Sequence, residues 1–338
     1  MKTYSFKDAP IQLHGAIISK NGRIVRMDED VAKTVNEYTG VRVFSGAGVR
    51  VRFNTDSATI KIKARVESNG IDWAIPLSGS CGIDVMIGNG KEQYRLGILN
   101  PTNYGITEFE KTFTKSPKMD TVSLLLPRNE PVLDLEISID DDASIMPPTP
   151  YKHEKPIVFY GSSITEGGCA SSVSKCYVSI VTRWLNTEYL NLGISGNARG
   201  EAQMAEYIKN LNMSIFVMDY DYNAPNAEHL NKTHEPFFKI IREKNPTLPI
   251  VFMTKPDFDS DKADNAIRRE IVRKTYENAL ASGDENVYFI DGESFFGNVD
   301  RSICTVEGCH PTDLGFMRMA EVVYPVLKEI LEKNDENL

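Results

Sequence analysis

Residues 156–167 read Pro156-Ile-Val-Phe-Tyr-Gly-Ser-Ser-Ile-Thr-Glu-Gly167, and the interpretation of the whole chain starts from them. The apolar run from Pro156 to Tyr160 predicts a short buried strand. Gly161-Ser162-Ser163 then breaks this run sharply, because glycine accepts backbone angles that other residues avoid. Open α/β sheets bind ligands at the carboxyl ends of their strands, so a serine at this position is well placed for chemistry. The alternative is a plain Gly-Ser turn between two elements.

Strand and helix patterns alternate in the part of the chain that follows residue 150. Such alternation predicts a parallel sheet of about five strands with helices on both faces. Tyr177, Ile180 and Trp184 lie on one face of a predicted helix because they recur at helical spacing. The predicted strands are Pro156–Tyr160, Tyr189–Leu192, Ile215–Asp219, Ile250–Thr254 and Val287–Asp291, and the predicted helices cover residues 177–185, 202–211, 237–242, 263–281 and 313–332.

The first part of the chain has a different pattern. Residues 49–53, 58–64 and 133–139 alternate apolar and polar side chains with a period of two, and Asn21-Gly22 is a hairpin turn signal. Many short alternating strands predict an all-β sandwich. Residues 140–150 combine three aspartates with three prolines, which is typical of a linker. We therefore predict two domains, a β-sandwich at residues 1–150 and an α/β/α domain at residues 151–338.

Composition restricts the classes of partner and the compartment. The 338 residues carry a formal net charge of −9, which argues against nucleic acid or an anionic membrane as the main partner, because both are bound through basic patches. Residues 1–10 lack the apolar core of a signal peptide. The five cysteines form no scaffold pattern, which favours reduced thiols in a cytoplasm. The oligomeric state is left open.

Residues suited to acyl transfer follow several of the predicted strands. Ser163 follows the first strand, Gly196 the second and Asn223 the third, while Glu307 and His310 precede the last helix. A serine hydroxyl needs a base to take its proton, and a histidine supported by a carboxylate is such a base. Preorganised N–H donors must then stabilise the oxyanion of the tetrahedral intermediate. No metal or organic cofactor is needed for this chemistry.

In their order, these blocks resemble the SGNH (GDSL-type) hydrolases, which are esterases with a flavodoxin-like three-layer fold. The resemblance covers roughly residues 155–332 and implies that Ser163 is the nucleophile, that His310 and Glu307 complete a triad, and that Ser163, Gly196 and Asn223 form the oxyanion hole. Gly82-Ile-Asp-Val-Met86 is similar to the Gly-x-Asp-Leu-Tyr motif of a β-sandwich that precedes one branch of the family. Members of this branch resemble carbohydrate esterases, and some relatives are acyltransferases.

The chain departs from the family pattern at two positions of the site. Ser162 stands where the family usually has aspartate, and Glu307 replaces the aspartate of the last block. Asn223 could instead cap a turn, Gly196 could be a plain turn glycine and Glu307 a solvated acid. For the remaining candidates we favour roles other than metal or substrate binding. Cys304 and Cys309 are expected to be buried or idle thiols beside His310, and Asp219 and Asp221 to be structural caps. His14 is expected to be an ordinary strand residue, and surface positions are expected for Arg199, His153, His229 and His234.

We therefore expect a serine esterase that hydrolyses short acyl esters, with acetyl groups on carbohydrates as the favoured substrate. Its partner would be a small-molecule or oligosaccharide ester. Two alternatives remain open. One is an acyltransferase that uses the same acyl-Ser163 intermediate, and the other is a catalytically silent carbohydrate-binding protein.

Overall fold

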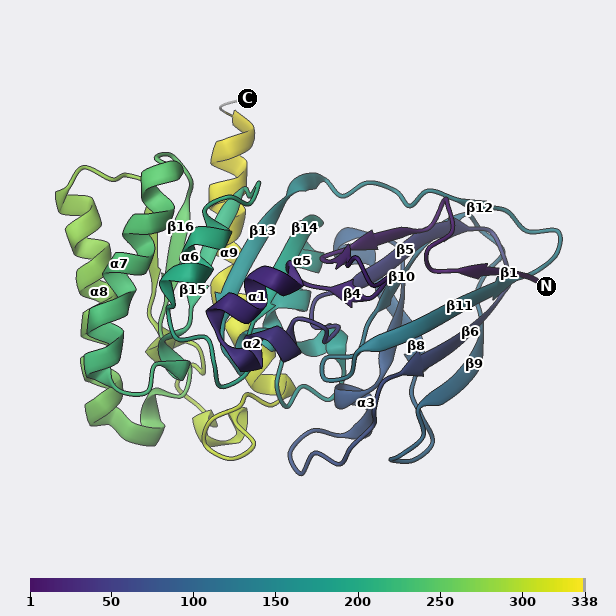
Figure 1. Cartoon of the computed structure of the whole chain (residues 1–338), viewed down its shortest axis with the longest axis horizontal. Coiled ribbons are helices and arrows are strands. Elements are labelled where there is room, and N and C mark those ends of the chain that lie inside the picture. Colours follow the sequence, from purple (N-terminus) through teal and green to yellow (C-terminus); the bar gives the residue numbers. More distant parts are fainter. Residues whose placement is uncertain (337–338) are drawn as a thin grey trace.

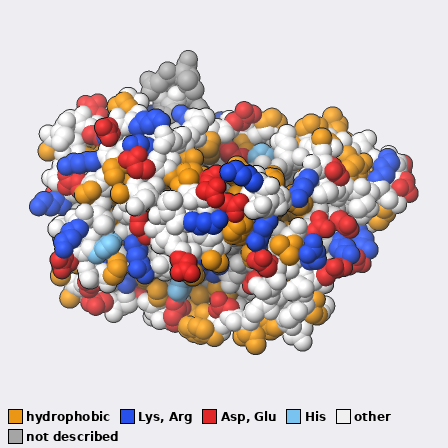
Figure 2. Space-filling view, in the orientation of Figure 1, with side chains coloured by type: hydrophobic (Ala, Val, Ile, Leu, Met, Phe, Trp, Pro, Cys, Tyr) orange, Lys and Arg blue, Asp and Glu red, His pale blue; other side chains and the backbone are white. Residues whose placement is uncertain are grey.

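In the computed structural model, which describes residues 1–336, an antiparallel β-sandwich is followed by an α/β/α unit (Figure 1). Residues 337 and 338, at the end of the predicted second domain, lie outside the described residues. None of the helices among residues 1–336 is long and apolar enough to cross a membrane. On the face shown in Figure 2, basic and acidic side chains are interspersed.

The sandwich consists of two antiparallel sheets that share one apolar core. One sheet has the strand order β1-β11-β6-β9, and the other has β12-β5-β10-β7-β8 with β2 paired to β5. Ile62 and Ile137 of the first sheet pack with Val51 and Leu124 of the second, as the period of two predicts. The strands are β1 Lys2–Ser5, β2 Gln12–His14, β5 Arg50–Thr55, β6 Thr59–Val66, β7 Ile83–Ile87, β8 Tyr94–Leu99, β9 Glu108–Thr114, β10 Asp120–Leu125, β11 Val132–Ile139 and β12 Ile145–Met146.

The first part of the chain also holds elements outside the two sheets. Strands β3 (Ile17–Ile18) and β4 (Ile24–Val25) form the hairpin predicted at Asn21-Gly22. Three short helices, α1 (Glu29–Val35), α2 (Glu37–Arg42) and α3 (Leu77–Ser80), were not predicted. They are too short for a clear helical repeat, and α1 and α2 begin at side-chain caps from Asp28 and Asn36.

Five parallel strands form the second unit in the order β14-β13-β15-β16-β17. The strands are β13 His153–Gly161, β14 Thr187–Gly193, β15 Ile215–Asp219, β16 Ile250–Met253 and β17 Val287–Ile290, and the helices are α4 Ser163–Glu166, α5 Tyr177–Leu185, α6 Ala202–Ile208, α7 Ala227–Lys244, α8 Lys262–Ala281 and α9 Asp313–Glu336. Helices α5 and α9 cover one face of the sheet, and α6, α7 and α8 cover the other. All five predicted strands are present with small changes at their ends.

Residues from the first part of the chain complete the core on one face of the parallel sheet. Met27, Ala32 and Val43, around α1 and α2, are fully buried in the same cluster as Phe216 and Phe237. The α1 and α2 segment therefore packs on the parallel sheet rather than in the sandwich (Figure 1). It stays a prediction that the chain divides near residue 150 into two domains that each fold independently.

Two parts of the secondary-structure prediction were wrong. Helix α7 begins at Ala227 rather than near Phe237, and it continues through Pro236. A proline normally interrupts the hydrogen-bond ladder of a helix, which is why the sequence pattern suggested a later start. The expected linker also contains a short strand, β12, which pairs Ile145 with Thr55 of β5.

A buried ionic cluster joins the two parts of the chain at α4. Glu166, at the end of α4, has no exposed side-chain surface, and it pairs with three arginines from the first part of the chain. The nearest N–O distances are 3.2 Å to Arg26, 2.9 Å to Arg42 and 3.0 Å to Arg128. Burial alone would raise the pKa of Glu166, but the three guanidinium groups hold it below its usual value. The carboxylate is therefore charged and is the common partner of all three cations.

We predict that Glu166→Gln strongly destabilises the protein. Removing the buried carboxylate charge leaves three guanidinium groups without their shared counter-ion, and breaking a buried ion pair in this way costs about 3–5 kcal/mol. The free energy of unfolding would be measured by urea denaturation. Glu332→Gln is the matched control, because the exposed Lys328–Glu332 pair at 3.4 Å should contribute at most about 1 kcal/mol. Equal stabilities for the two variants would contradict this account of the cluster.

Candidate active site

The candidate nucleophile lies where β13 turns into α4. A Cβ atom on Gly161 would lie 2.0 Å from Thr165 Oγ1 and 2.4 Å from the carbonyl oxygen of Asp219, so this close approach requires glycine. Ser162 then caps α4, because its Oγ accepts a hydrogen bond from the Ile164 N–H at 3.1 Å. Ser163 is the first residue of α4 and is 7% exposed. The turn therefore gives the two serines different contacts: the Ser162 side chain caps α4, and the Ser163 side chain contacts His310.

The register of the parallel sheet explains why the site residues converge. Gly161 of β13 is paired with Gly193 of β14 on one side and with Asp219 of β15 on the other. The three strands thus end at the same level, and the segments that follow them meet at one edge. Those segments carry Ser163, Gly196 and Asn223, the residues predicted to form the oxyanion hole.

Ser163 and His310 are in direct contact although 147 positions separate them in the chain. Ser163 Oγ lies 2.7 Å from His310 Nε2. This distance is typical of a strong hydrogen bond. With Nδ1 protonated, Nε2 accepts the serine proton; this tautomer is assigned from the surrounding hydrogen bonds. The arrangement places a base on the serine hydroxyl.

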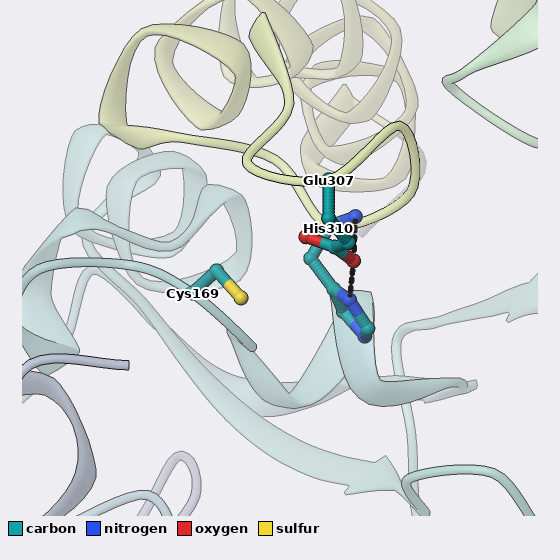
Figure 3. A group of neighbouring side chains, drawn as sticks. All are labelled: Cys169, Glu307 and His310. Atoms are coloured by element: carbon teal, nitrogen blue, oxygen red, sulfur yellow. Dashed lines mark hydrogen bonds and ion pairs between the residues drawn. The ribbon is translucent and has the colours of Figure 1, made fainter. Parts of the chain in front are cut away.

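Glu307 reaches the opposite side of the same imidazole. Its Oε1 accepts a hydrogen bond from His310 Nδ1 and a second, at 3.0 Å, from the His310 backbone N–H. Figure 3 shows both bonds converging on one carboxylate oxygen. The longer glutamate side chain is accommodated because it folds back over its own turn. The structure thus brings Ser163, His310 and Glu307 into one relay, and their catalytic roles stay predictions.

The surroundings of His310 raise the pKa of its imidazole. Burial by itself would lower the pKa of His310, but hydrogen bonding and charge attraction from Cys309 and Glu307 outweigh it and raise the pKa above its ordinary value of 6.5. A raised pKa makes His310 a stronger base toward Ser163. It also means that the neutral, active form is reached only as the pH rises through that higher value.

The donors predicted for the oxyanion lie on the loops after β14 and β15. Gly196 is exposed with a φ of 70°, and a Cβ atom there would meet nothing within 4 Å, so the space beside it is open. Asn223 Oδ1 accepts a hydrogen bond from the Ala198 N–H at 3.4 Å. This bond directs the amide oxygen to the neighbouring loop and leaves Nδ2 as the end that can donate to an oxyanion.

Most of the alternative site residues have structural contacts. The Asp219 carboxylate accepts hydrogen bonds from Thr165 at 2.9 Å and Tyr177 at 2.7 Å, and Asp221 accepts one from the Lys255 N–H at 3.0 Å. The remaining contacts are Cys304 with Arg318, Arg199 with the Gly196 carbonyl, His229 with the Arg199 carbonyl, and His14 with Glu188 of β14.

The prediction of a surface position for His234 was wrong. His234 is 1% exposed, and its Nδ1 lies 2.9 Å from Thr275 Oγ1. Burial lowers the pKa of His234 to about 3, so the ring is neutral. Its ring stacks on Tyr220 with centroids 5.7 Å apart. Because the start of α7 was placed too late, His234 could not be assigned to the buried face of that helix.

Sequence reasoning missed Cys169, which lies next to the relay. Its Sγ atom lies within 4.8 Å of a carboxylate oxygen of Glu307 and of a ring nitrogen of His310 (Figure 3). It follows Gly167 and Gly168, in the loop after α4, and has an unusual φ of 71°. The Gly-Gly pair was a signal that the backbone here makes a tight turn, but nothing in the sequence indicated its distance from His310.

We predict that Glu307→Gln retains a folded protein with strongly reduced turnover. The acid orients the imidazole and stabilises its charged form without attacking the substrate, and its loss costs about 10⁴ in kcat in a comparable triad. Removing its negative charge should also lower the pKa of His310, so the acid limb of the pH–rate profile should move to lower pH. Glu307→Asp should keep partial activity because the side chain is shorter. Hydrolysis of nitrophenyl acetate across about pH 5–9 would measure these effects, over a range that brackets the histidine titration.

Glu332→Gln serves as the control for the loss of one acidic charge far from the relay. If Glu307→Gln kept the full kcat and an unshifted acid limb, Glu307 would not be the orienting acid. Ser163 and His310 would then act as a dyad.

Comparisons with known proteins agree with this geometry. Residues 154–328 match the model of the GDSL-like lipase/acylhydrolase family, and residues 1–145 match the model described as the N-terminus of Esterase_SGNH_hydro-type, named GxDLY. The GxDLY match bears out the resemblance to the branch with an N-terminal β-sandwich, while the position of the motif at Gly82–Met86 stays a prediction. Comparison with curated proteins gives no significant match.

Three solved structures illustrate the similarity. A protein described as a GDSL-like lipase from Bacteroides ovatus is 26% identical, with 98% of each chain covered and a TM-score of 0.87. The salicylyl-acyltransferase SsfX3 of a tetracycline biosynthetic pathway is 21% identical, with 97% of each chain covered and a TM-score of 0.80. A family two carbohydrate esterase from Clostridium thermocellum, in complex with cellohexaose, is 17% identical, covers 85% of this chain and 93% of its own, and has a TM-score of 0.61.

The last two similarities show a shared fold, whereas the family models match the sequence itself. With a serine, a histidine and a carboxylate in hydrogen-bonded order at the edge of a five-stranded parallel sheet, the chain is a serine hydrolase of ester bonds. It belongs to the GDSL-like lipase/acylhydrolase family.

Proposed function

We propose that this protein removes short acyl groups, acetyl groups by preference, from acylated carbohydrates through an acyl-Ser163 intermediate. The observation that carries the proposal is the Ser163–His310 hydrogen bond of 2.7 Å, supported by Glu307 on the other side of the imidazole. A protein that only binds carbohydrate has no use for this relay. In a serine hydrolase the three groups act in this order.

The reaction would proceed in two half-reactions. His310 Nε2 takes the Ser163 proton while Oγ attacks the ester carbonyl carbon, and the negative oxygen is stabilised by the Ser163 N–H, the Gly196 N–H and Asn223 Nδ2. His310 then gives the proton to the departing sugar oxygen, leaving the acyl group on Ser163. In the second half, water gives its proton to His310 and attacks the acyl-enzyme. The carboxylic acid leaves and Ser163 regains its proton.

The crowding around Ser163 supports a short acyl group. Ser163 is 7% exposed, and all the residues from 161 to 170 are buried. On the His310 side, a Cβ atom at Gly168 would lie 3.0 Å from the Ser163 carbonyl oxygen and 3.1 Å from His310 Cδ2. Space opens instead beside Gly196, where a Cβ atom would meet nothing within 4 Å. An acetyl group fits such a site better than a long chain does.

An exposed aromatic side chain of the first part of the chain supports a carbohydrate substrate. Trp73 is 80% exposed in the loop that leads into α3. Helix α3 touches the loop after α4, because Ser78 Oγ donates a hydrogen bond to the Ser171 carbonyl at 2.7 Å. An indole ring offers a flat apolar face and a polar N–H, which suits a sugar ring with its C–H face and hydroxyls. The carbohydrate esterases that share the fold are consistent with this substrate class.

Transfer of the acyl group to another alcohol is the second candidate. The fold similarity to a salicylyl-acyltransferase, with a TM-score of 0.80, supports acyl transfer as this second candidate. The two functions share the acyl-enzyme and differ in whether water or a bound acceptor completes the second half-reaction. Competition between water and an added acceptor distinguishes them.

We also propose that the enzyme works in a reducing cytoplasm. All five cysteines are free thiols, and four of them are buried. Reduced thiols are the usual state in the cytosol, where glutathione and thioredoxin act. Localisation of the tagged chain in cells of its source would test this, and recovery outside the cytoplasm would reject it.

We predict that the enzyme releases acetate from acetylated oligosaccharides faster than it releases longer acids from matched esters. Released acid would be measured over a panel that varies acyl length and sugar separately, with Ser163→Ala as the inactive control. Trp73→Ala should raise KM for acetylated oligosaccharides and leave nitrophenyl acetate hydrolysis unchanged, because only the sugar reaches the indole ring.

Two results would overturn parts of the proposal. Dominant transfer of acetyl to an added sugar acceptor at low acceptor concentration would identify a transferase. Absence of any acid release or transfer across the panel, with the protein still binding oligosaccharide, would identify a silent binder.

A further inference from the structure

A sulfur ligand lies beside the catalytic relay. The ligand atoms of Cys169, Glu307 and His310 all lie within 4.8 Å of one another, and the three side chains come from two separate loops (Figure 3). A thiolate, a carboxylate oxygen and an imidazole nitrogen form a set typical of zinc and of softer ions such as cadmium. This set differs from the Cys304, Cys309 and His310 metal site considered from the sequence. Cys304 cannot join such a site, because it is buried and its Sγ accepts a hydrogen bond from Arg318.

The three side chains can surround a tetrahedral ion after small rearrangements. Ligand distances of about 2.0–2.3 Å place the donors of a tetrahedral site about 3.3–3.8 Å from each other. The widest present separation of up to 4.8 Å must shrink by about 1 Å, whereas Glu307 Oε1 and His310 Nδ1, which are now hydrogen-bonded to each other, must move apart to admit the ion. Side-chain torsions supply both movements. Three protein ligands would leave a fourth position for water, as in open zinc sites.

The backbone holds Cys169 close to the imidazole. Cys169 is 7% exposed, and its φ of 71° is in the left-handed region that non-glycine residues avoid. Such strained residues persist where the surrounding structure fixes them, and they are concentrated at functional sites. Its neighbour Gly168 has little room for a side chain, because a Cβ atom would lie 3.1 Å from His310 Cδ2. The loop is thus packed directly against the catalytic histidine.

We propose that Cys169, Glu307 and His310 form a reversible inhibitory site for a thiophilic divalent cation, zinc or cadmium. The ion binds the imidazole through a ring-nitrogen lone pair. If it takes Nε2, Ser163 loses its base directly. If it takes Nδ1, the ring proton must move to Nε2, which then can no longer accept the serine proton. Either way the metal occupies the relay and stops acyl transfer.

Metal binding must release one proton from the thiol. Burial, with a contribution from the Glu307 charge, raises the pKa of Cys169 to about 12, so the free enzyme carries the S–H form. The ion displaces this proton to solvent and forms the metal–thiolate bond without any change of oxidation state. A neutral buried thiol is also a poor target for oxidants, because thiolates are the reactive form.

Cadmium titration of the full chain tests the site directly, with the ultraviolet cadmium–thiolate charge-transfer band as the readout. We expect one ion per chain for the wild type. Cys169→Ser should lose the band and bind at least about 10-fold more weakly, the lower end of what even an outer-shell change costs a metal site. Cys81→Ala is the matched control, because Cys81 is a free thiol buried in the core of the sandwich and lies outside the cluster; it should bind cadmium like the wild type. Should Cys169→Ser fold poorly, Cys169→Gly accepts the positive φ.

Inhibition of ester hydrolysis by the metal ion is the second readout. Unlike cadmium binding, this readout rests on the proposed function. Zinc or cadmium should inhibit nitrophenyl acetate hydrolysis, a chelator should restore it, and Cys169→Ser should need at least about 10-fold more metal relative to its own uninhibited rate. Cadmium affinity that is equal in the wild type and Cys169→Ser, or lost in Cys81→Ala, would overturn the metal site. Normal cadmium binding without any ester hydrolysis would instead reject the proposed function and leave the site standing.

Discussion

The carboxylate of Glu166 joins the two parts of this protein at the sheet edge where the candidate site lies. Three guanidinium groups, on Arg26, Arg42 and Arg128, surround it, and its side chain has no exposed surface. Removing charges from water is costly, and the cost is offset only when partners and geometry are nearly complete. Arg26 also donates to the carbonyls of Asn191 and Gly193 at 2.9 and 2.8 Å, so the cluster fixes the end of β14 as well as α4.

The position of this cluster determines what each half of the chain contributes. Glu166 lies three residues beyond Ser163 in the same short helix, so the arginines of the first part of the chain fix the helix that carries the candidate nucleophile. The predicted catalytic groups themselves lie in the second part. The first part contributes positioning charge and, through α3 and its preceding loop, the surface beside the site. This division explains how the first part of the chain can matter for the reaction without holding a predicted catalytic group.

Sequence reasoning recovered what depends on local pattern. The five parallel strands followed from apolar runs. Ser163 and His310 were singled out from the turn after the first strand, the block before the last helix and the family resemblance; the structure brings them into contact, and their catalytic roles stay predictions. It missed α1, α2 and the early turns of α7, because short helices lack a clear period and Pro236 looked like a boundary. Glu166 stands in the stretch that starts the whole interpretation, yet its partners lie 140, 124 and 38 residues away. Such pairings, like the approach of Cys169 to His310, depend on tertiary packing.

The account stands on acyl transfer through Ser163 rather than its neighbour Ser162, whose hydroxyl caps α4. The most direct measurement is peptide mapping by mass spectrometry after the protein is stopped during turnover of an acetyl ester or treated with a fluorophosphonate. The account predicts a single adduct on Ser163, present in Ser162→Ala and absent in Ser163→Ala and in wild type that was unfolded before treatment. An adduct on Ser162, or equal labelling of the unfolded chain, would contradict it.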